Sequence, residues 1–227
     1  MTIAIDGPAG AGKSTVARGL ASRLDLPYVD SGATYRAAAL KVLESGVPRA
    51  DARAVIDLID HTEIEFVARD GDWRIWLDGR DVTPFIRTPQ VTLAAAEVSR
   101  LPEVRKKLIA LQRNVPGDRG VVMEGRDIGT VVFPEAPLKV FLEADPAERA
   151  RRRLRQEEAA GRRASLTETA DEIRRRDQLD AQRKVSPLVP AVDAVRIDST
   201  HLTAEEVVDQ ILGLAKREKL IERTDPR

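Results

Sequence analysis

Residues Gly7–Ser14 read Gly-Pro-Ala-Gly-Ala-Gly-Lys-Ser, which fits the phosphate-loop pattern G-x-x-x-x-G-K-[ST] at every position. Glycines in such a loop let backbone N–H groups turn inward around phosphate oxygens, and the helix that starts there adds unpaired N–H groups and a positive dipole end. Lys13 is expected to reach the β- and γ-phosphates of a nucleotide, and the Ser14 hydroxyl to ligate magnesium. The residues expected to bind the nucleotide phosphates are Gly7, Pro8, Ala9, Gly10, Ala11, Gly12, Lys13, Ser14 and Thr15.

The segments on either side of the loop are the strand and the helix that it requires. Thr2–Ile5 is an apolar run that ends at the loop, and Val16, Leu20 and Leu24 recur at a spacing of four, as in an amphipathic helix. The same alternation continues along the chain and predicts an α/β fold, with a five-stranded parallel sheet flanked by helices. The other expected strands are Tyr28–Asp30, Val121–Met123, Leu138–Leu142 and Val195–Ile197, and the other expected helices are Tyr35–Glu44, Ala50–Asp60, Pro102–Arg113 and Ala204–Lys216.

One segment departs from this alternation. Between residues 63 and 84, apolar and polar residues alternate on both sides of Asp70-Gly71, a dipeptide typical of hairpin turns. Trp73 and Trp76 lie in this segment and are expected to cover a small antiparallel sheet, which needs large side chains to be stable. We therefore expect a single core domain over residues 1–220 that carries an antiparallel insertion at 63–84. The polar tail, residues 221–227, is expected to be frayed.

Composition excludes several classes of protein. The 227 residues include 37 Lys and Arg against 37 Asp and Glu, a balance that argues against a general nucleic-acid binder. The absence of cysteine excludes disulfides, thiolate catalysis and cysteine-ligated metal sites. The start of the chain lacks the features of a signal peptide, and the sequence has no run of about 18 apolar residues. These observations predict a soluble cytoplasmic protein that binds neither nucleic acid nor membranes.

Three further motifs are expected beside the phosphate loop, because ligands of parallel sheets bind beyond the carboxyl ends of the strands. Asp30–Arg36 follows the second strand, and its serine, tyrosine and arginine suit a phosphorylated sugar. Glu124–Thr130 follows the third strand and places Arg126 and Asp127 between glycines. Arg176, Asp177, Asp180 and Arg183 share one face of a helix. Taken singly, each motif has a structural alternative: a helix cap at Ser31, an internal ion pair, and an exposed salt-bridged helix.

A basic stretch completes the pattern. Arginines are dense between Arg149 and Arg163, and a solvated helix face explains part of this density. Arginines that close over a transferring phosphoryl group would stabilise its charge and exclude water. We therefore expect a short helical lid over residues 148–166, with Arg153 and Arg155 as its catalytic members.

Taken together, these stretches resemble the bacterial type of cytidylate kinase, within the P-loop nucleoside monophosphate kinases. The resemblance covers nearly the whole chain in order and includes the inserted hairpin. The segments that carry it are Ile5–Ser14, Val29–Arg36, Gly125–Pro134, Arg176–Ala191 and Ile197–Thr203.

The resemblance implies an enzyme of pyrimidine nucleotide metabolism that transfers the γ-phosphoryl group of ATP to CMP or dCMP with Mg2+, as a cytoplasmic monomer. Its implied catalytic residues are Lys13, Arg126 and Arg183, and the lid expected from the basic stretch adds Arg153 and Arg155. The residues implied to bind CMP are Ser31, Tyr35, Arg36, Arg105, Arg126, Asp127, Arg176, Asp180 and Arg183. Ala96 stands where this family often has a serine near the cytosine. Either the preference for cytosine over uracil is therefore weaker, or Arg105 and Asp127 provide it alone. The alternatives are another small-molecule P-loop kinase, such as a UMP or shikimate kinase, and an ATP-binding switch module without catalysis.

Overall fold

The chain divides into two compact units, Met1–Leu26 with Arg119–Arg227 and Pro27–Asp118. The computed structural model describes residues 1–69, 72–115, 119–159, 161, 163–183 and 185–221. The expected Asp70-Gly71 turn and nearly all of the expected tail, residues 222–227, lie outside the described residues.

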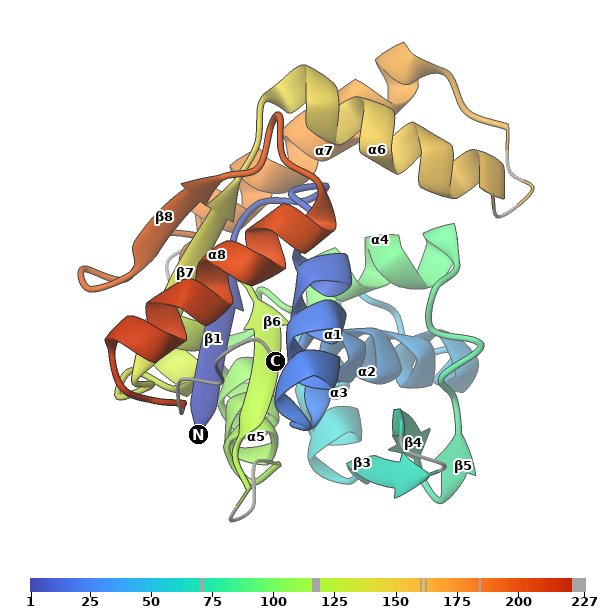
Figure 1. Ribbon diagram of the computed structural model, residues 1–227. Coiled ribbons are helices and arrows are strands. Elements are labelled where there is room, and N and C mark those ends of the chain that lie inside the picture. Colours follow the sequence, from blue (N-terminus) through green and yellow to red (C-terminus); the bar gives the residue numbers. More distant parts are fainter. Residues whose placement is uncertain (70–71, 116–118, 160, 162, 184, 222–227) are drawn as a thin grey trace. The chain divides into compact units, whose positions relative to one another are not determined.

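The central sheet has five strands in the order β2-β6-β1-β7-β8 (Figure 1). All five expected strands are confirmed, and their bounds are β1 Thr2–Asp6, β2 Tyr28–Asp30, β6 Val121–Gly125, β7 Leu138–Glu143 and β8 Val195–Asp198. β1 pairs in parallel with β6 and with β7, and β7 pairs in parallel with β8. Ile3, Ala4 and Ile5 are fully buried, as expected for the central strand of a parallel sheet.

Helices of the first unit cover this sheet. α1 (Lys13–Leu24) buries Val16 and Leu20 and packs beside α8 (Ala204–Arg217) on one face of the sheet (Figure 1). α6 (Pro146–Ala159) packs against α7 (Leu166–Ala181). α6 contains most of the expected lid, residues 148–166, and α7 begins at the last residue of that range. A one-turn π-helix, η1 (Ile128–Val132), follows β6 and was not expected from the sequence.

The second unit contains the antiparallel insertion. β3 (Ile64–Arg69), β4 (Asp72–Leu77) and β5 (Arg80–Asp81) form a three-stranded sheet in sequence order. Its helices are α2 (Gly32–Ser45), α3 (Ala52–Asp60), α4 (Pro89–Val98) and α5 (Pro102–Arg113). α4 was not expected, although Thr88 caps it by accepting a hydrogen bond from the Val91 N–H at 3.2 Å, and Pro89 occupies its first turn.

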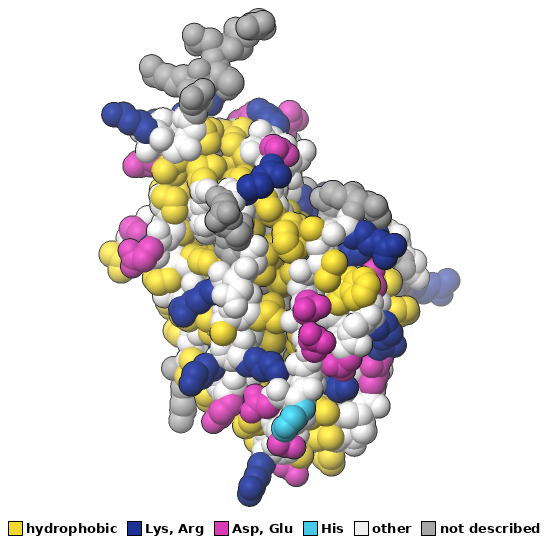
Figure 2. Space-filling view, turned by 90° about the horizontal axis from the view of Figure 1, so that it is seen from below, with side chains coloured by type: hydrophobic (Ala, Val, Ile, Leu, Met, Phe, Trp, Pro, Cys, Tyr) yellow, Lys and Arg dark blue, Asp and Glu magenta, His cyan; other side chains and the backbone are white. Residues whose placement is uncertain are grey.

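The surface mixes charges of both signs. Basic and acidic side chains lie interspersed on the face that Figure 2 shows, in agreement with their equal numbers in the sequence. Among the residues that the structure describes, no helix combines the length and the apolar character needed to cross a membrane.

Candidate active site

The phosphate loop connects the end of β1 to the start of α1, as its pattern predicts. Its backbone requires glycine at two close approaches. A Cβ on Gly7, whose φ is 150°, would lie 2.1 Å from the backbone oxygen of Leu142. A Cβ on Gly10, whose φ is 76°, would lie 2.8 Å from the backbone oxygen of Arg149. The loop is therefore packed directly on β7 and on the first turn of α6.

Lys13 is the first residue of α1 and is almost completely buried. Its ammonium group donates a hydrogen bond to the Pro8 carbonyl at 2.7 Å, so that the side chain folds back over its own loop. Burial lowers the pKa of Lys13 to about 7, and the positive charges of Arg126 and Arg176 act in the same direction. Because burial opposes the charged form of Lys13, an anion bound beside its ammonium group would favour protonation. The loop therefore suits an anionic ligand.

Asp6, at the end of β1, fixes the loop that follows β6. Its two carboxylate oxygens accept hydrogen bonds from the backbone N–H groups of Ile128 at 2.8 Å and Gly129 at 2.7 Å. Burial raises the pKa of Asp6 to about 6, although both N–H donors act in the opposite direction. Asp6 therefore holds the turn after Arg126 and Asp127 against the strand that carries the phosphate loop. These bonds favour a structural role for Asp6.

A buried ion cluster joins Arg126, from the Glu124–Thr130 motif, to Asp180 and Arg183. The Arg126 side chain donates to one oxygen of Asp180 at 2.8 Å, and Arg183 pairs with the other oxygen. Burial by itself would raise the pKa of Asp180, but the charges of Arg126, Arg183 and Arg176 lower it overall. Arg183 lies beyond Ala181, where α7 ends, so the expected common helix face extends only as far as Asp180. The ion pair nevertheless brings Arg183 to the same carboxylate.

Two side chains that were given no role from the sequence hold the apex of the phosphate loop. Asp177 accepts a hydrogen bond from the Ala9 N–H at 3.2 Å and forms an ion pair with Arg149. Arg149 donates to the Ala9 carbonyl at 3.1 Å and to the Ala144 carbonyl at 3.1 Å. The N–H and the carbonyl of one loop residue are thus held by α7 and α6 together.

The two arginines expected to be catalytic members of the lid lie on α6. Arg153 pairs with Glu157 at 2.6 Å, and Arg155 pairs with Glu148 at 3.1 Å. Their side chains are 33% and 67% exposed, so both keep access to solvent. Their role in phosphoryl transfer remains a prediction.

A cavity of about 230 Å³ opens beside the phosphate loop. The loop lines it through Gly10, Ala11 and Gly12, α6 through Arg152, and the segment after β8 through Ser199. Thr203, which also lines it, caps α8 by accepting a hydrogen bond from the Glu206 N–H at 3.2 Å. The sequence included Ser199 in a family-like stretch, but the cavity itself depends on chain folding that no local pattern shows.

In the second unit, the motif after β2 forms the start of α2. Ser31 is buried, and its carbonyl accepts a hydrogen bond from the Thr34 hydroxyl at 2.8 Å. The Gln112 amide donates to the Thr34 hydroxyl at 2.8 Å. Arg36 pairs with Asp30 at 2.5 Å, and Arg87 pairs with the same oxygen of Asp30 at 2.8 Å. This motif therefore gathers two guanidinium groups on one carboxylate.

Tyr35 and Arg105 also meet within the second unit. The Arg105 guanidinium carbon lies 5.1 Å from the centroid of the Tyr35 ring, in a cation–π contact. Arg105 is 2% exposed and donates to the Ser99 carbonyl at 3.2 Å. The Ser99 hydroxyl donates to the Ala96 carbonyl at 3.1 Å, which links the position of the expected serine to that of Arg105. The structure thus brings together two residues 70 positions apart that were both expected to bind the acceptor.

The five-stranded parallel sheet, the complete phosphate loop at the end of β1 and the arginine-rich helices define a P-loop kinase. The family model described as cytidylate kinase matches residues 3–217. A cytidylate kinase from Carboxydothermus hydrogenoformans is 50% identical over 96% of this chain and 98% of its own length, and one from Symbiobacterium thermophilum is 48% identical over 96% of each. The chain therefore belongs to the cytidylate kinase family and is a phosphotransferase.

Solved structures add a likeness of fold. An uncharacterized protein from Eubacterium ventriosum superposes with a TM-score of 0.50 at 12% identity, over 95% of this chain and 98% of its own. At this identity the likeness concerns the fold alone.

Proposed function

We propose that this chain transfers the γ-phosphoryl group of ATP to CMP or dCMP and releases ADP with CDP or dCDP. The observation that carries the proposal is the buried ammonium of Lys13 within a complete phosphate loop, which Asp6 ties to the loop of Arg126 and Asp127. Membership of the cytidylate kinase family supports the choice of acceptor.

The donor is assigned to the first unit. Within Gly7–Thr15, Pro8 has no N–H group and the Ala9 N–H is bonded to Asp177, so the other backbone N–H groups and the Lys13 side chain would hold the phosphates. The cavity beside the loop would receive the adenosine. The Ser14 hydroxyl, next to Lys13 at the start of α1, is an oxygen ligand of the kind that Mg2+ prefers. When bound, Mg2+ would neutralise part of the charge on the phosphates.

The acceptor residues are assigned unit by unit. In the first unit, Arg126 and Arg183 would bind phosphate, Arg176 and Asp180 the ribose, and Asp127 the cytosine amino group. In the second unit, Ser31, Tyr35 and Arg36 would hold the phosphate and sugar of the acceptor, and Arg105 the base.

The mechanism needs no strong general base, because the attacking oxygen belongs to a phosphate that is largely ionised at neutral pH. The protein would position the two substrates and neutralise the charge that spreads over the transferred phosphoryl oxygens. Lys13, Arg126 and Arg183 would supply this charge, with Arg153 and Arg155 added when the lid closes. In this proposal the protein acts as a cytoplasmic monomer. Its partners are ATP and the nucleoside monophosphate, and it needs neither nucleic acid nor a membrane.

A coupled assay of ADP release with ATP and Mg2+ tests the acceptor. CMP and dCMP should support turnover, whereas shikimate should not. Turnover with another acceptor but not with CMP or dCMP would indicate a different small-molecule kinase. ATP binding without acceptor-dependent ADP release would indicate a switch module.

The same assay tests base selection. Because Ala96 lacks the hydroxyl of the serine that is common in the family, kcat/KM for UMP should approach that for CMP, with a ratio below about tenfold. Ala96→Ser should increase the preference for CMP. A CMP preference of more than about a hundredfold in the unsubstituted protein would show that Arg105 and Asp127 suffice without the hydroxyl.

The affinity for ATP should depend on pH through Lys13. With a pKa of about 7 in the nucleotide-free loop, Lys13 is mostly neutral at pH 8, and bound phosphates should restore its proton. ATP binding should therefore take up a proton at pH 8 and weaken as pH rises from 7 to 9, by at most about tenfold per pH unit. Calorimetry in two buffers of different ionisation enthalpy measures this uptake, and zero uptake at pH 8 would contradict the proposed role.

A further inference from the structure

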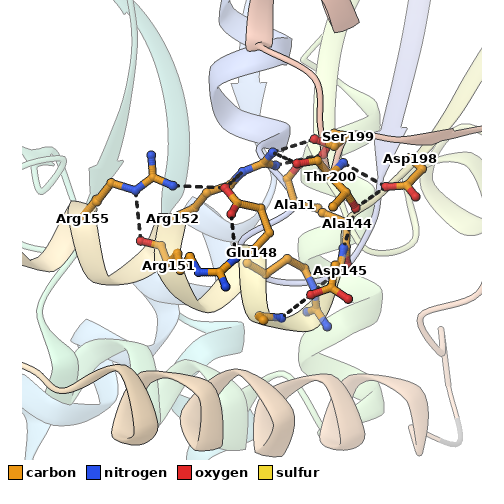
Figure 3. Close-up of polar contacts among 12 residues, drawn as sticks. Ala11, Ala144, Asp145, Glu148, Arg151, Arg152, Arg155, Asp198, Ser199 and Thr200 are labelled. Atoms are coloured by element: carbon orange, nitrogen blue, oxygen red, sulfur yellow. Dashed lines mark hydrogen bonds and ion pairs between the residues drawn. The ribbon is translucent and has the colours of Figure 1, made fainter.

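Arg152 of α6 has contacts that the transfer mechanism does not use (Figure 3). All three of its guanidinium nitrogens donate to protein oxygens. Nε donates to Glu148 at 3.2 Å, one terminal nitrogen to the Ser199 hydroxyl at 2.9 Å, and the other to the Ser199 carbonyl at 2.6 Å. The side chain is 20% exposed. The guanidinium is therefore held by protein acceptors through all three of its nitrogens.

Ser199 connects Arg152 to the phosphate loop. Ser199 is 2% exposed, and its hydroxyl lies 3.1 Å from the Ala11 carbonyl and 3.0 Å from the Glu143 carbonyl. A hydroxyl has one proton to donate, and the N–H of Arg152 occupies its acceptor side. Arg152 therefore turns the Ser199 proton toward the carbonyls of the phosphate loop and of β7.

Holding the Ala11 carbonyl also orients the next N–H group of the loop. The peptide between Ala11 and Gly12 is planar and trans, so its carbonyl and its N–H point in opposite directions. With the carbonyl held on Ser199, the Gly12 N–H points away from Ser199. Backbone N–H groups of this loop are the donors that a phosphate requires.

Arg152 also borders the cavity beside the phosphate loop. Arg152, Ser199 and Gly12 all line this cavity, and a Cβ on Gly12 would lie 3.7 Å from a terminal nitrogen of Arg152. One side chain thus shapes the cavity wall and, through Ser199, holds the Ala11–Gly12 peptide.

We propose that Arg152 is a positioning residue for the phosphoryl donor, acting through Ser199 on the Ala11–Gly12 peptide. The proposal rests on the proposed function, because it takes the phosphate loop and its cavity as the ATP site. It separates Arg152 from Arg153 and Arg155, which are proposed to act on the transferred group directly.

The test measures ADP binding by calorimetry without acceptor, together with KM for ATP and for CMP. Arg152→Ala should weaken ADP binding and raise KM for ATP by about tenfold, while KM for CMP stays within about twofold. Arg152→Lys keeps the charge but lacks the planar fork, so its loss should be intermediate. Arg151→Ala is the matched control, because Arg151 also contacts Glu148, at 3.4 Å, but its side chain is 59% exposed. It should bind ADP as the unsubstituted protein does.

A double-variant cycle separates action through Ser199 from direct attraction of phosphate. Ser199→Ala should weaken ADP binding to a similar extent, and adding Arg152→Ala to it should change little further. Additive losses, or equal increases of both KM values, would overturn the proposal. If Arg152→Ala does not fold, Arg152→Lys replaces it in the cycle. ADP binding needs no acceptor. Failure of turnover with CMP would therefore reject the proposed function, but the effect of Arg152 on ADP binding would still be measured.

Discussion

Replacing Lys13 with alanine is expected to lower kcat by about a thousandfold or more, because the ammonium would lie against the phosphates while charge develops on the transferred group. In the nucleotide-free loop this ammonium donates to the Pro8 carbonyl, an acceptor within the loop itself. The hydrogen bond that the substitution removes is therefore local to the loop. Single-turnover kinetics with saturating ATP and CMP would measure the loss in the chemical step.

Thermal unfolding provides the control for this variant. Burial lowers the pKa of Lys13 to about 7, so the charged side chain is less stable in the folded protein than in the unfolded chain. Lys13→Ala should therefore unfold at the same temperature as the unsubstituted protein or slightly above it. Loss of activity together with a large fall in unfolding temperature would indicate a structural role, and retained turnover would remove Lys13 from the mechanism.

The features that could be predicted from the sequence are those that depend on residues adjacent in the chain. The phosphate loop, its strand and its helix occupy residues 2–24 without interruption, and each remaining strand of the sheet is a short local segment, of which β6 and β7 are mostly apolar. α4 was missed although Thr88 and Pro89 are ordinary signals for the start of a helix. Its three successive alanines do not give the apolar periodicity on which the other helices were recognised.

The contacts around the phosphate loop could not be predicted in this way. Asp177 lies 168 positions from Ala9, and Ser199 lies 188 positions from Ala11. A hydrogen bond across such a distance depends on how the strands and helices pack, and no spacing in the chain encodes it. Arg149 and Arg152 likewise stand in a run of arginines, and only the fold shows which of them face the loop.

Asp180→Ala is expected to have the largest effect on stability, about 3 kcal/mol at pH 7. The Asp180 side chain is 4% exposed and neutralises Arg126 and Arg183, whose side chains are 16% and 13% exposed. Its removal would leave two guanidinium groups mostly buried without this carboxylate. Because the charges around it lower the pKa of Asp180, its stabilising effect is complete above the ordinary carboxyl pKa and is lost only as pH falls below it. Urea unfolding at pH 7 therefore measures the whole contribution.

Asp171→Ala is the matched control, because Asp171 pairs on the same helix with Arg174 at 2.9 Å but both side chains are more than half exposed. Its cost should stay below about 1 kcal/mol. Inorganic phosphate distinguishes a purely structural cluster from an anion site. If Arg183 binds the phosphate of the acceptor, phosphate should restore part of the stability of Asp180→Ala by replacing the missing negative charge, and should stabilise Asp171→Ala no more than the unsubstituted protein. Equal stabilisation of both variants by phosphate would limit the cluster to a structural role, since the arginines released by the substitution would then have no affinity for the group they are proposed to bind.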